Sequence, residues 1–124
     1  MKFLNFSSDS PNYRQNNGSM IWNVAPWTLD EDITEIALSS CFIFFDKIGS
    51  YKPIVLSCSL VDANYANFDG IIACGLPKSK ALVQKPSTLE FWKMDCSRPR
   101  TVTFSLKGID AQTIKHINIT LALK

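Results

Sequence analysis

The sequence predicts an all-β protein, namely an antiparallel β-sandwich or jelly-roll-like single domain of about seven or eight strands. The main observation is a strict alternation of apolar and polar side chains in the C-terminal quarter of the chain. One apolar face consists of Val102, Phe104 and Leu106, and a second consists of Ile117, Ile119, Leu121 and Leu123. A period of two is typical of half-buried strands, because successive side chains leave opposite faces of the pleat.

Two further observations support this fold class. Short apolar runs are separated by turn-forming residues at spacings of roughly 8–15 residues, as in sandwiches and barrels. Helical periodicity is nearly absent, which argues against a fold in which helices alternate with strands. At 124 residues the chain has the size of one domain and can bury a core of its own.

Composition and charge exclude several classes of partner. The net charge is only +2, and the 13 Lys and Arg residues are dispersed, so neither nucleic acid nor a membrane surface is an expected partner. Residues 1–6 lack the roughly 7–15 consecutive apolar residues of a secretory signal. No segment approaches the roughly 20 apolar residues of a membrane span.

Residues 1–19 are expected to form a weakly structured N-terminal arm, followed by a β-sandwich domain at 20–124. Their composition, rich in Ser, Asn, Asp and Pro, is that of turns and loops. Phe3, Leu4 and Phe6 have two alternatives, to add a short strand to a sheet edge or to dock on a neighbouring subunit.

The segment 28–45 is ambiguous. Thr28 and Glu31 fit a capping box, which favours a short helix at 30–38. A polar turn followed by a long strand at 35–45 is favoured instead, because Ile36, Leu38, Phe42 and Phe44 share one face at period two.

The remaining segments read as strands and turns. A hairpin turn is expected at 46–53 and a loop at 62–70. Further strands are expected at 54–61, 71–74, 81–83 and 88–94. In the last of these Trp92 alternates with Leu89 and Phe91, which places its ring outside the main core, against another layer, a neighbour or a ligand.

No catalytic or metal-binding constellation stands out. The four cysteines (41, 58, 74 and 96) show no C-x-x-C spacing, and apolar neighbours indicate buried, unpaired thiols in a reducing compartment. The one histidine, His116, lies on the polar face of a strand, which gives a nucleophile no obvious base. The acidic stretch Asp30, Glu31, Asp32 and Glu35 is read as a solvated turn rather than a calcium or acid–base site. The sequence therefore predicts no enzyme, no cofactor and no metal.

Aromatic side chains are the best candidates for an interface or for stacking on a ligand. Trp22 and Trp27 could stack on a sugar ring, although burial in a core or interface is the more common role of tryptophan. The full set of candidates is Phe3, Phe6, Trp22, Trp27, Tyr65, Phe68 and Trp92.

In architecture alone, a short β-only chain with an N-terminal arm is similar to small structural proteins of viruses and phages, such as capsid, penton, cementing and fibre-head domains. This similarity implies a non-enzymatic module that works as a homo-oligomer, a trimer or a pentamer, with other structural proteins in a virion assembled in a reducing cytoplasm. The alternative is a lectin-like carbohydrate-binding β-sandwich, whose partner would be a glycan. The host, the oligomer number and the receptor do not follow from the sequence.

Overall fold

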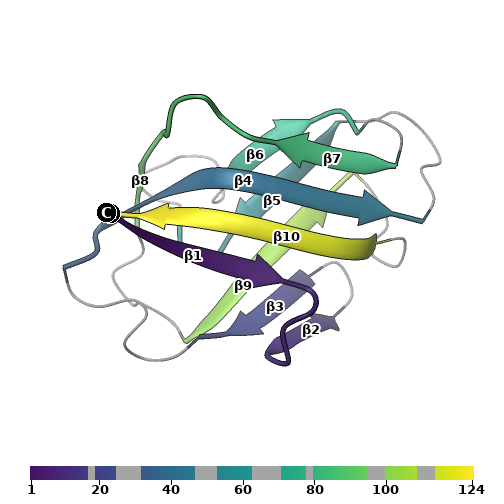
Figure 1. The fold of residues 1–124 in the computed structure, drawn as a ribbon, viewed down its shortest axis with the longest axis horizontal. Coiled ribbons are helices and arrows are strands. Elements are labelled where there is room, and N and C mark those ends of the chain that lie inside the picture. Colours follow the sequence, from purple (N-terminus) through teal and green to yellow (C-terminus); the bar gives the residue numbers. More distant parts are fainter. Residues whose placement is uncertain are drawn as a thin grey trace.

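The computed structural model describes residues 1–16, 19–24, 32–46, 53–62, 71–77, 80–94, 100–108 and 114–124. Ten strands form in these residues, without a helix (Figure 1). They are β1 (Lys2–Ser7), β2 (Tyr13–Asn16), β3 (Ser19–Asn23), β4 (Glu35–Phe45), β5 (Ile54–Cys58), β6 (Ile71–Gly75), β7 (Ala81–Gln84), β8 (Trp92–Lys93), β9 (Thr101–Lys107) and β10 (Ile114–Leu123). It follows that the described residues contain no helix long and apolar enough to cross a membrane.

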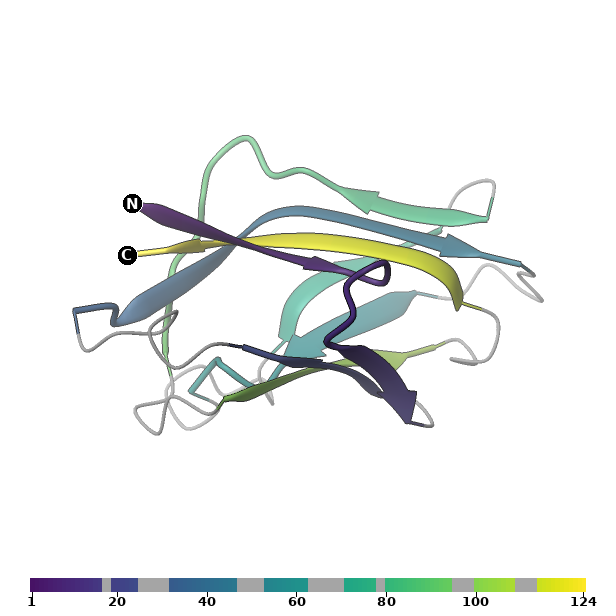
Figure 2. The same ribbon diagram turned by 60° about the horizontal axis from the view of Figure 1, so that its bottom comes forward.

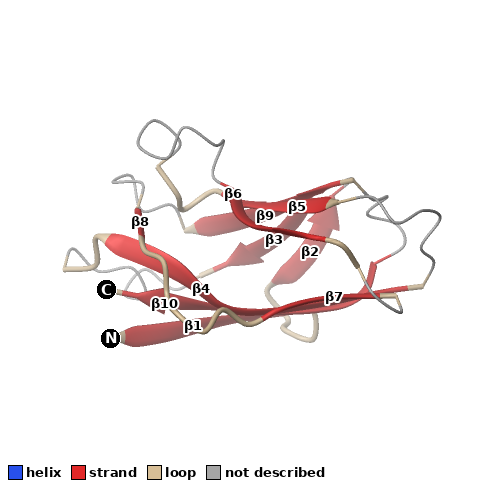
Figure 3. Cartoon of the chain, turned by 90° about the horizontal axis from the view of Figure 1, so that it is seen from above, coloured by secondary structure: helices blue, strands red, loops and turns tan. Residues whose placement is uncertain are grey.

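The strands form two antiparallel sheets packed face to face, which Figures 2 and 3 show as two layers. The first sheet has the order β1-β10-β4-β7, with β8 also pairing β4, and the second has the order β2-β3-β9-β5-β6. With the short β2 and β8 set aside, eight strands remain, in the orders 1-8-3-6 and 2-7-4-5 along the chain. This is the strand order of a jelly roll, so the predicted fold class is confirmed.

The core lies between the two sheets and contains the alternating residues of β9 and β10. Ile117, Ile119 and Leu121 are fully buried, as are Val102 and Phe104 opposite them. The predicted phase of both strands is therefore correct. The last strand lies inside the first sheet, between β1 and β4 (Figure 1).

The N-terminal residues differ from the weakly structured arm that their composition predicts. All six residues of β1 pair with β10, from Lys2 opposite Leu123 to Ser7 opposite Asn118. Phe6 is 1% exposed and packs edge-on against Trp22 and Phe104, at centroid distances of 5.5 and 5.0 Å. The alternative of an added edge strand is thus the correct one for these residues. This strand is difficult to predict from the sequence because the residues after Ser7 have a turn-rich composition and because its partner, β10, lies more than 100 residues away in the chain.

Strand β4 covers the predicted range 35–45, but a β-bulge changes its phase. Leu38 lies opposite Leu121 and Ser40 opposite Thr120, so β4 has one more residue here than β10. Before the bulge Ile36 and Leu38 face the core, and after it Cys41, Ile43 and Phe45 do. The prediction that Phe42 and Phe44 share the face of Ile36 is therefore wrong. The described part of the alternative helix at 30–38 is likewise a turn and a strand.

The predicted strand at 88–94 is reduced to β8, which pairs Trp92 with Ile36 and Lys93 with Glu35. Residues 85–91 form an arc without strand pairing between β7 and β8 (Figure 1). The predicted strands at 54–61, 71–74 and 81–83 correspond to β5, β6 and β7. Strand β6 is an edge strand with partly exposed residues. The predicted hairpin turn and most of the loop at 62–70 lie outside the described residues.

Candidate functional site

The structure separates the aromatic candidates. Phe6 and Trp22 lie in the core, and Trp22 donates its indole N–H to the Ser7 carbonyl at 2.8 Å, so neither ring is available to a ligand or partner. Phe3, on β1, is 57% exposed. Trp92 is partly buried and packs against the core, which corrects the expectation that its ring lies outside it. Trp27, Tyr65 and Phe68 lie outside the described residues.

The first candidate surface lies on the outer face of the first sheet. The bulge in β4 turns Phe42 and Phe44 outward, and Val83 of β7 lies opposite Phe42 in the register. Phe44 is 41% and Val83 is 52% exposed. Leu76, 58% exposed, shares a depression with Val83 beyond the β7 edge. We refer to Phe42, Phe44, Val83 and Leu76 as the outer-face patch.

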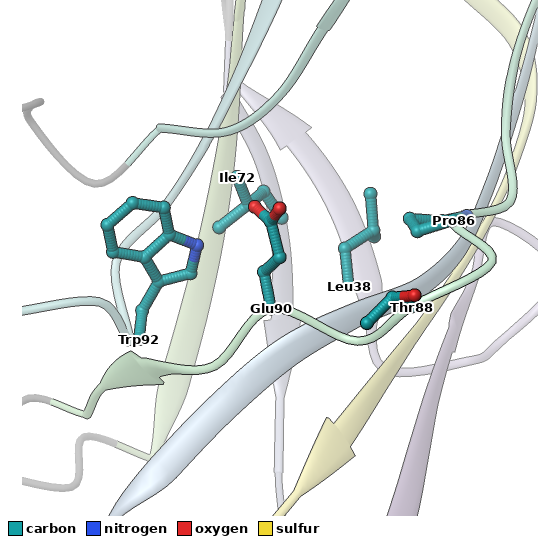
Figure 4. A pocket seen from close by; sticks show the side chains of 6 residues that line it. All are labelled: Leu38, Ile72, Pro86, Thr88, Glu90 and Trp92. Carbon is teal, nitrogen blue, oxygen red and sulfur yellow. The ribbon is translucent and has the colours of Figure 1, made fainter.

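The second candidate is a pocket at the side of the sandwich, where the arc 85–91 stands away from β4. It has a volume of about 200 Å³ and is lined by Leu38, Ile72, Pro86, Thr88, Glu90 and Trp92, which we call the lateral pocket. Figure 4 shows the Glu90 carboxylate between Trp92 and Leu38, pointing toward Ile72. Leu38, Ile72, Pro86 and Trp92 supply its apolar groups, whereas Thr88 and Glu90 supply a hydroxyl group and a carboxylate.

Backbone groups of β4 also face the lateral pocket. Glu35 and Lys124 exchange both backbone hydrogen bonds, at 3.1 and 3.0 Å, so every second residue of β4 onward from Glu35 points its N–H and C=O toward β10. The alternate residues, beginning with Ile36 opposite Trp92, point toward β8 up to the bulge. The Thr34 carbonyl, just before the strand, also accepts the Met94 N–H at 2.8 Å, whereas the Thr34 N–H donates to the Lys124 carbonyl at 2.9 Å. After the Ile36–Trp92 pair the ladder ends, which leaves the N–H and C=O of Leu38 directed at the pocket.

Bulges occur on both sides of this pocket. The bulge of β4 follows Leu38 directly. On β6, Ala73 lies opposite Leu56 and Ile71 opposite Ser57, so Ile72 is the extra residue of a second bulge. Bulges redirect side chains and are over-represented beside binding sites. Ile72 thus owes its place in the lining to a bulge of one sheet, and Leu38 lies directly before a bulge of the other.

The single histidine contacts a serine that the sequence does not single out. Ser8 Oγ lies 3.1 Å from His116 Nδ1. The same Oγ accepts the Ile117 N–H at 3.0 Å, and the Ser8 N–H donates to the Ile117 carbonyl at 3.0 Å. These bonds continue the β1–β10 pairing past Ser7, so Ser8 fixes the end of β1. The His116 ring packs beside Phe44 at a centroid distance of 6.2 Å.

The described cysteines are free thiols in two environments. Burial raises the pKa of both Cys41 and Cys58 to about 12, so neither is a nucleophile near neutral pH. Cys74, on β6, is exposed rather than buried as predicted, and Cys96 lies outside the described residues. Within the described residues no group of three or more His, Cys, Asp or Glu side chains could hold a metal ion.

Few of the residues that form these two surfaces could be predicted from the sequence. The outer-face patch combines Phe44 of β4 with Val83 of β7, and the lateral pocket combines Thr88 and Glu90 with residues of other strands. Each surface arises only because the tertiary fold brings separate segments together. The adjacent Ser39 and Ser40, two polar residues in an otherwise alternating strand, were the one local sign of the bulge. Comparisons of the chain with protein-family models, with curated proteins and with solved structures find no match.

Proposed function

We propose that this chain is a non-enzymatic structural module of the viral or phage type that works as an oligomer. Its role would be that of a capsid, penton, cementing or fibre-head domain, in a virion assembled in a reducing cytoplasm. The observation that carries the proposal is the outer-face patch, where apolar side chains of two neighbouring strands stand together in solvent. A contiguous exposed apolar patch marks a surface that another protein covers.

The position of the exposed apolar residues favours a ring. Phe44 and Val83 lie toward the β7 edge of the first sheet, whereas Phe3 lies on β1 at its opposite edge. A contact between the patch of one subunit and the Phe3 edge of the next joins two different surfaces. Such head-to-tail contacts give a ring when the rotation between neighbours closes and a filament when it does not, whereas a two-fold dimer repeats one surface. A trimer or a pentamer is the oligomer we expect, in contact with other structural proteins.

The lectin-like alternative retains one ring among the described residues. Jelly rolls occur in lectins as well as in viral capsids, so the fold permits both functions. Burial removes Trp22 from the set of stacking residues. Trp92 remains partly exposed at the lateral pocket, and a glycan-binding function would depend on it.

The mass of the protein in solution tests the proposal. We expect light scattering during gel filtration to give a trimer or a pentamer for the wild type. A Phe44→Ser, Val83→Ser double variant and a Phe3→Ser variant should both shift the protein toward the monomer. Ile21→Ser is the matched control, because Ile21 is a partly exposed apolar residue on the outer face of the second sheet. A wild-type monomer over the whole accessible concentration range would contradict the proposal.

A further inference from the structure

We propose that the lateral pocket binds one neutral pyranose ring of a glycan. The lining combines a partly exposed indole, three aliphatic side chains, one hydroxyl group and one carboxylate. A pyranose has an apolar face of C–H groups, which suits Trp92 and Ile72, and a rim of hydroxyl groups, which suits Thr88 and Glu90. This inference is independent of the oligomeric state.

The size of the lateral pocket limits the ligand to a single ring. Its volume of about 200 Å³ lies below the roughly 300–1,000 Å³ of sites for drug-sized ligands. The two pairings of β4 close it along the strand, β8 at Glu35 and Ile36 and β7 from Cys41 onward. The open edge of β4 between them is about four residues long, or roughly 13 Å. An extended peptide therefore has too little edge to add a strand here.

The polar groups of the pocket favour hydroxyl groups over a cation. Leu38 offers both a backbone donor and a backbone acceptor, and Thr88 offers a hydroxyl that does both. A sugar hydroxyl donates and accepts, so it can satisfy all of these groups, and two adjacent hydroxyls can donate to the two oxygens of Glu90. A guanidinium or ammonium group only donates, which leaves the Leu38 N–H unsatisfied.

The carboxylate also selects against acidic sugars. Glu90 is the only ionisable side chain in the described lining, and its carboxylate stands between Trp92 and Leu38 (Figure 4). A sugar acid would bring a second negative charge next to this carboxylate. Neutral hexoses, deoxyhexoses and N-acetylhexosamines are therefore the class we expect.

The two bulges make the pocket a built feature rather than a gap in packing. Without the bulge of β4 and the bulge at Ile72, both sheets would continue with regular edges on this side. The bulge of β6 adds Ile72 to the wall of this pocket, and the bulge of β4, in the other sheet, directly follows the lining residue Leu38. Bulges at such positions aim side chains at a ligand.

Nuclear magnetic resonance titration of the purified protein tests the inference. The probes are the methyl pyranosides of glucose, galactose, mannose, fucose and N-acetylglucosamine, with N-acetylneuraminic acid and N-acetylarginine amide as the acidic and cationic arms. The signal is the indole N–H resonance of Trp92, assigned by its loss in Trp92→Phe. We expect at least one neutral pyranoside to shift it saturably, with a Kd on the order of 1 mM.

Variants at exposed positions separate binding from folding. Glu90→Gln should weaken the affinity about tenfold, because the amide is neutral and replaces one of the two accepting oxygens with a donor. Thr88→Val should weaken it by a smaller factor, and Asp9→Asn, an exposed carboxylate on the β1–β2 turn, should leave it unchanged. The proposal is overturned if no neutral pyranoside shifts the Trp92 signal, if only N-acetylarginine amide or N-acetylneuraminic acid does, or if Glu90→Gln binds as the wild type does.

Discussion

The closing strand allows a sharp test of burial and register with two adjacent residues. Ile119, at the centre of β10, is fully buried between the sheets. Ile119→Ala removes three carbons, worth about 0.8 kcal/mol each, or about 2.4 kcal/mol in transfer free energy. The cavity left behind adds to this, so we expect the free energy of unfolding to fall by about 3–4 kcal/mol. That is a large share of the roughly 5–15 kcal/mol that holds a domain folded.

Thr120 is the matched control, because its side chain leaves the opposite face of the same strand. Thr120 Oγ1 accepts a hydrogen bond from Asn5 Nδ2 at 2.9 Å at the surface, so Thr120→Ala should cost about 1 kcal/mol or less. Urea denaturation of both variants, at two protein concentrations, measures the difference. A larger loss for Thr120→Ala would refute the strand phase. Large losses for both variants, dependent on concentration, would show that a subunit covers the outer face.

Three other predictions follow from β1 and from the cysteines. Phe6→Ala should lower the free energy of unfolding in urea by about 3–5 kcal/mol, because Phe6 fills the space beside Trp22 and Phe104. At the exposed Phe3, the change to Ala should lower it by about 0.5 kcal/mol or less, and equal losses would mean that β1 is not part of the core. A thiol reagent at pH 8, followed by mass spectrometry, should label Cys74 in the folded protein and reach Cys41 and Cys58 only at the rate of unfolding; rapid labelling of the buried pair would refute their burial. Burial raises the folded-state pKa of Cys41 and Cys58 from 9.0 to about 12, so their contribution to stability is complete below pH 9 and is lost as the pH rises toward 12. Over that pH range a Cys41→Ala, Cys58→Ala variant should lose less unfolding free energy than the wild type. Identical slopes of unfolding free energy against pH would argue against the raised pKa.

How far the sequence predicts this fold depends on the length and regularity of each strand. Strands β9 and β10 alternate over seven and ten residues, and their faces could be assigned without the structure. The range of strand β4 was predicted correctly, but the one extra residue of its bulge exchanges the inward and outward faces in the second half of the strand. An alternating pattern cannot assign these faces when the extra residue is not recognised. Strand β1 has only Leu4 and Phe6 facing inward, which is too short a pattern to distinguish from an arm.

The candidate surfaces were less accessible to sequence reasoning than the fold. The lateral pocket joins Leu38, Ile72 and the arc 85–91, which meet only because β4 and β6 lie at the same side of the sandwich. Its polar groups include the backbone of Leu38, which no residue type reveals. Trp92 was expected to lie outside the main core, and its packing against the core became clear only from the structure, where it pairs with Ile36.

The bulge in β4 also determines where this chain can change its length. Loss of Ser39 or Ser40 would join Leu38 to Cys41 through a single outward residue, so Ile36, Leu38, Cys41, Ile43 and Phe45 would all keep their places in the core. Loss of a residue elsewhere inside the strand would reverse the faces on one side of the loss and turn some of these residues outward. Related chains can therefore lose one residue at this pair of serines without changing which side chains of β4 face the core. Because the pair adjoins the lateral pocket, such a change would leave the folded framework intact while it alters what the pocket admits.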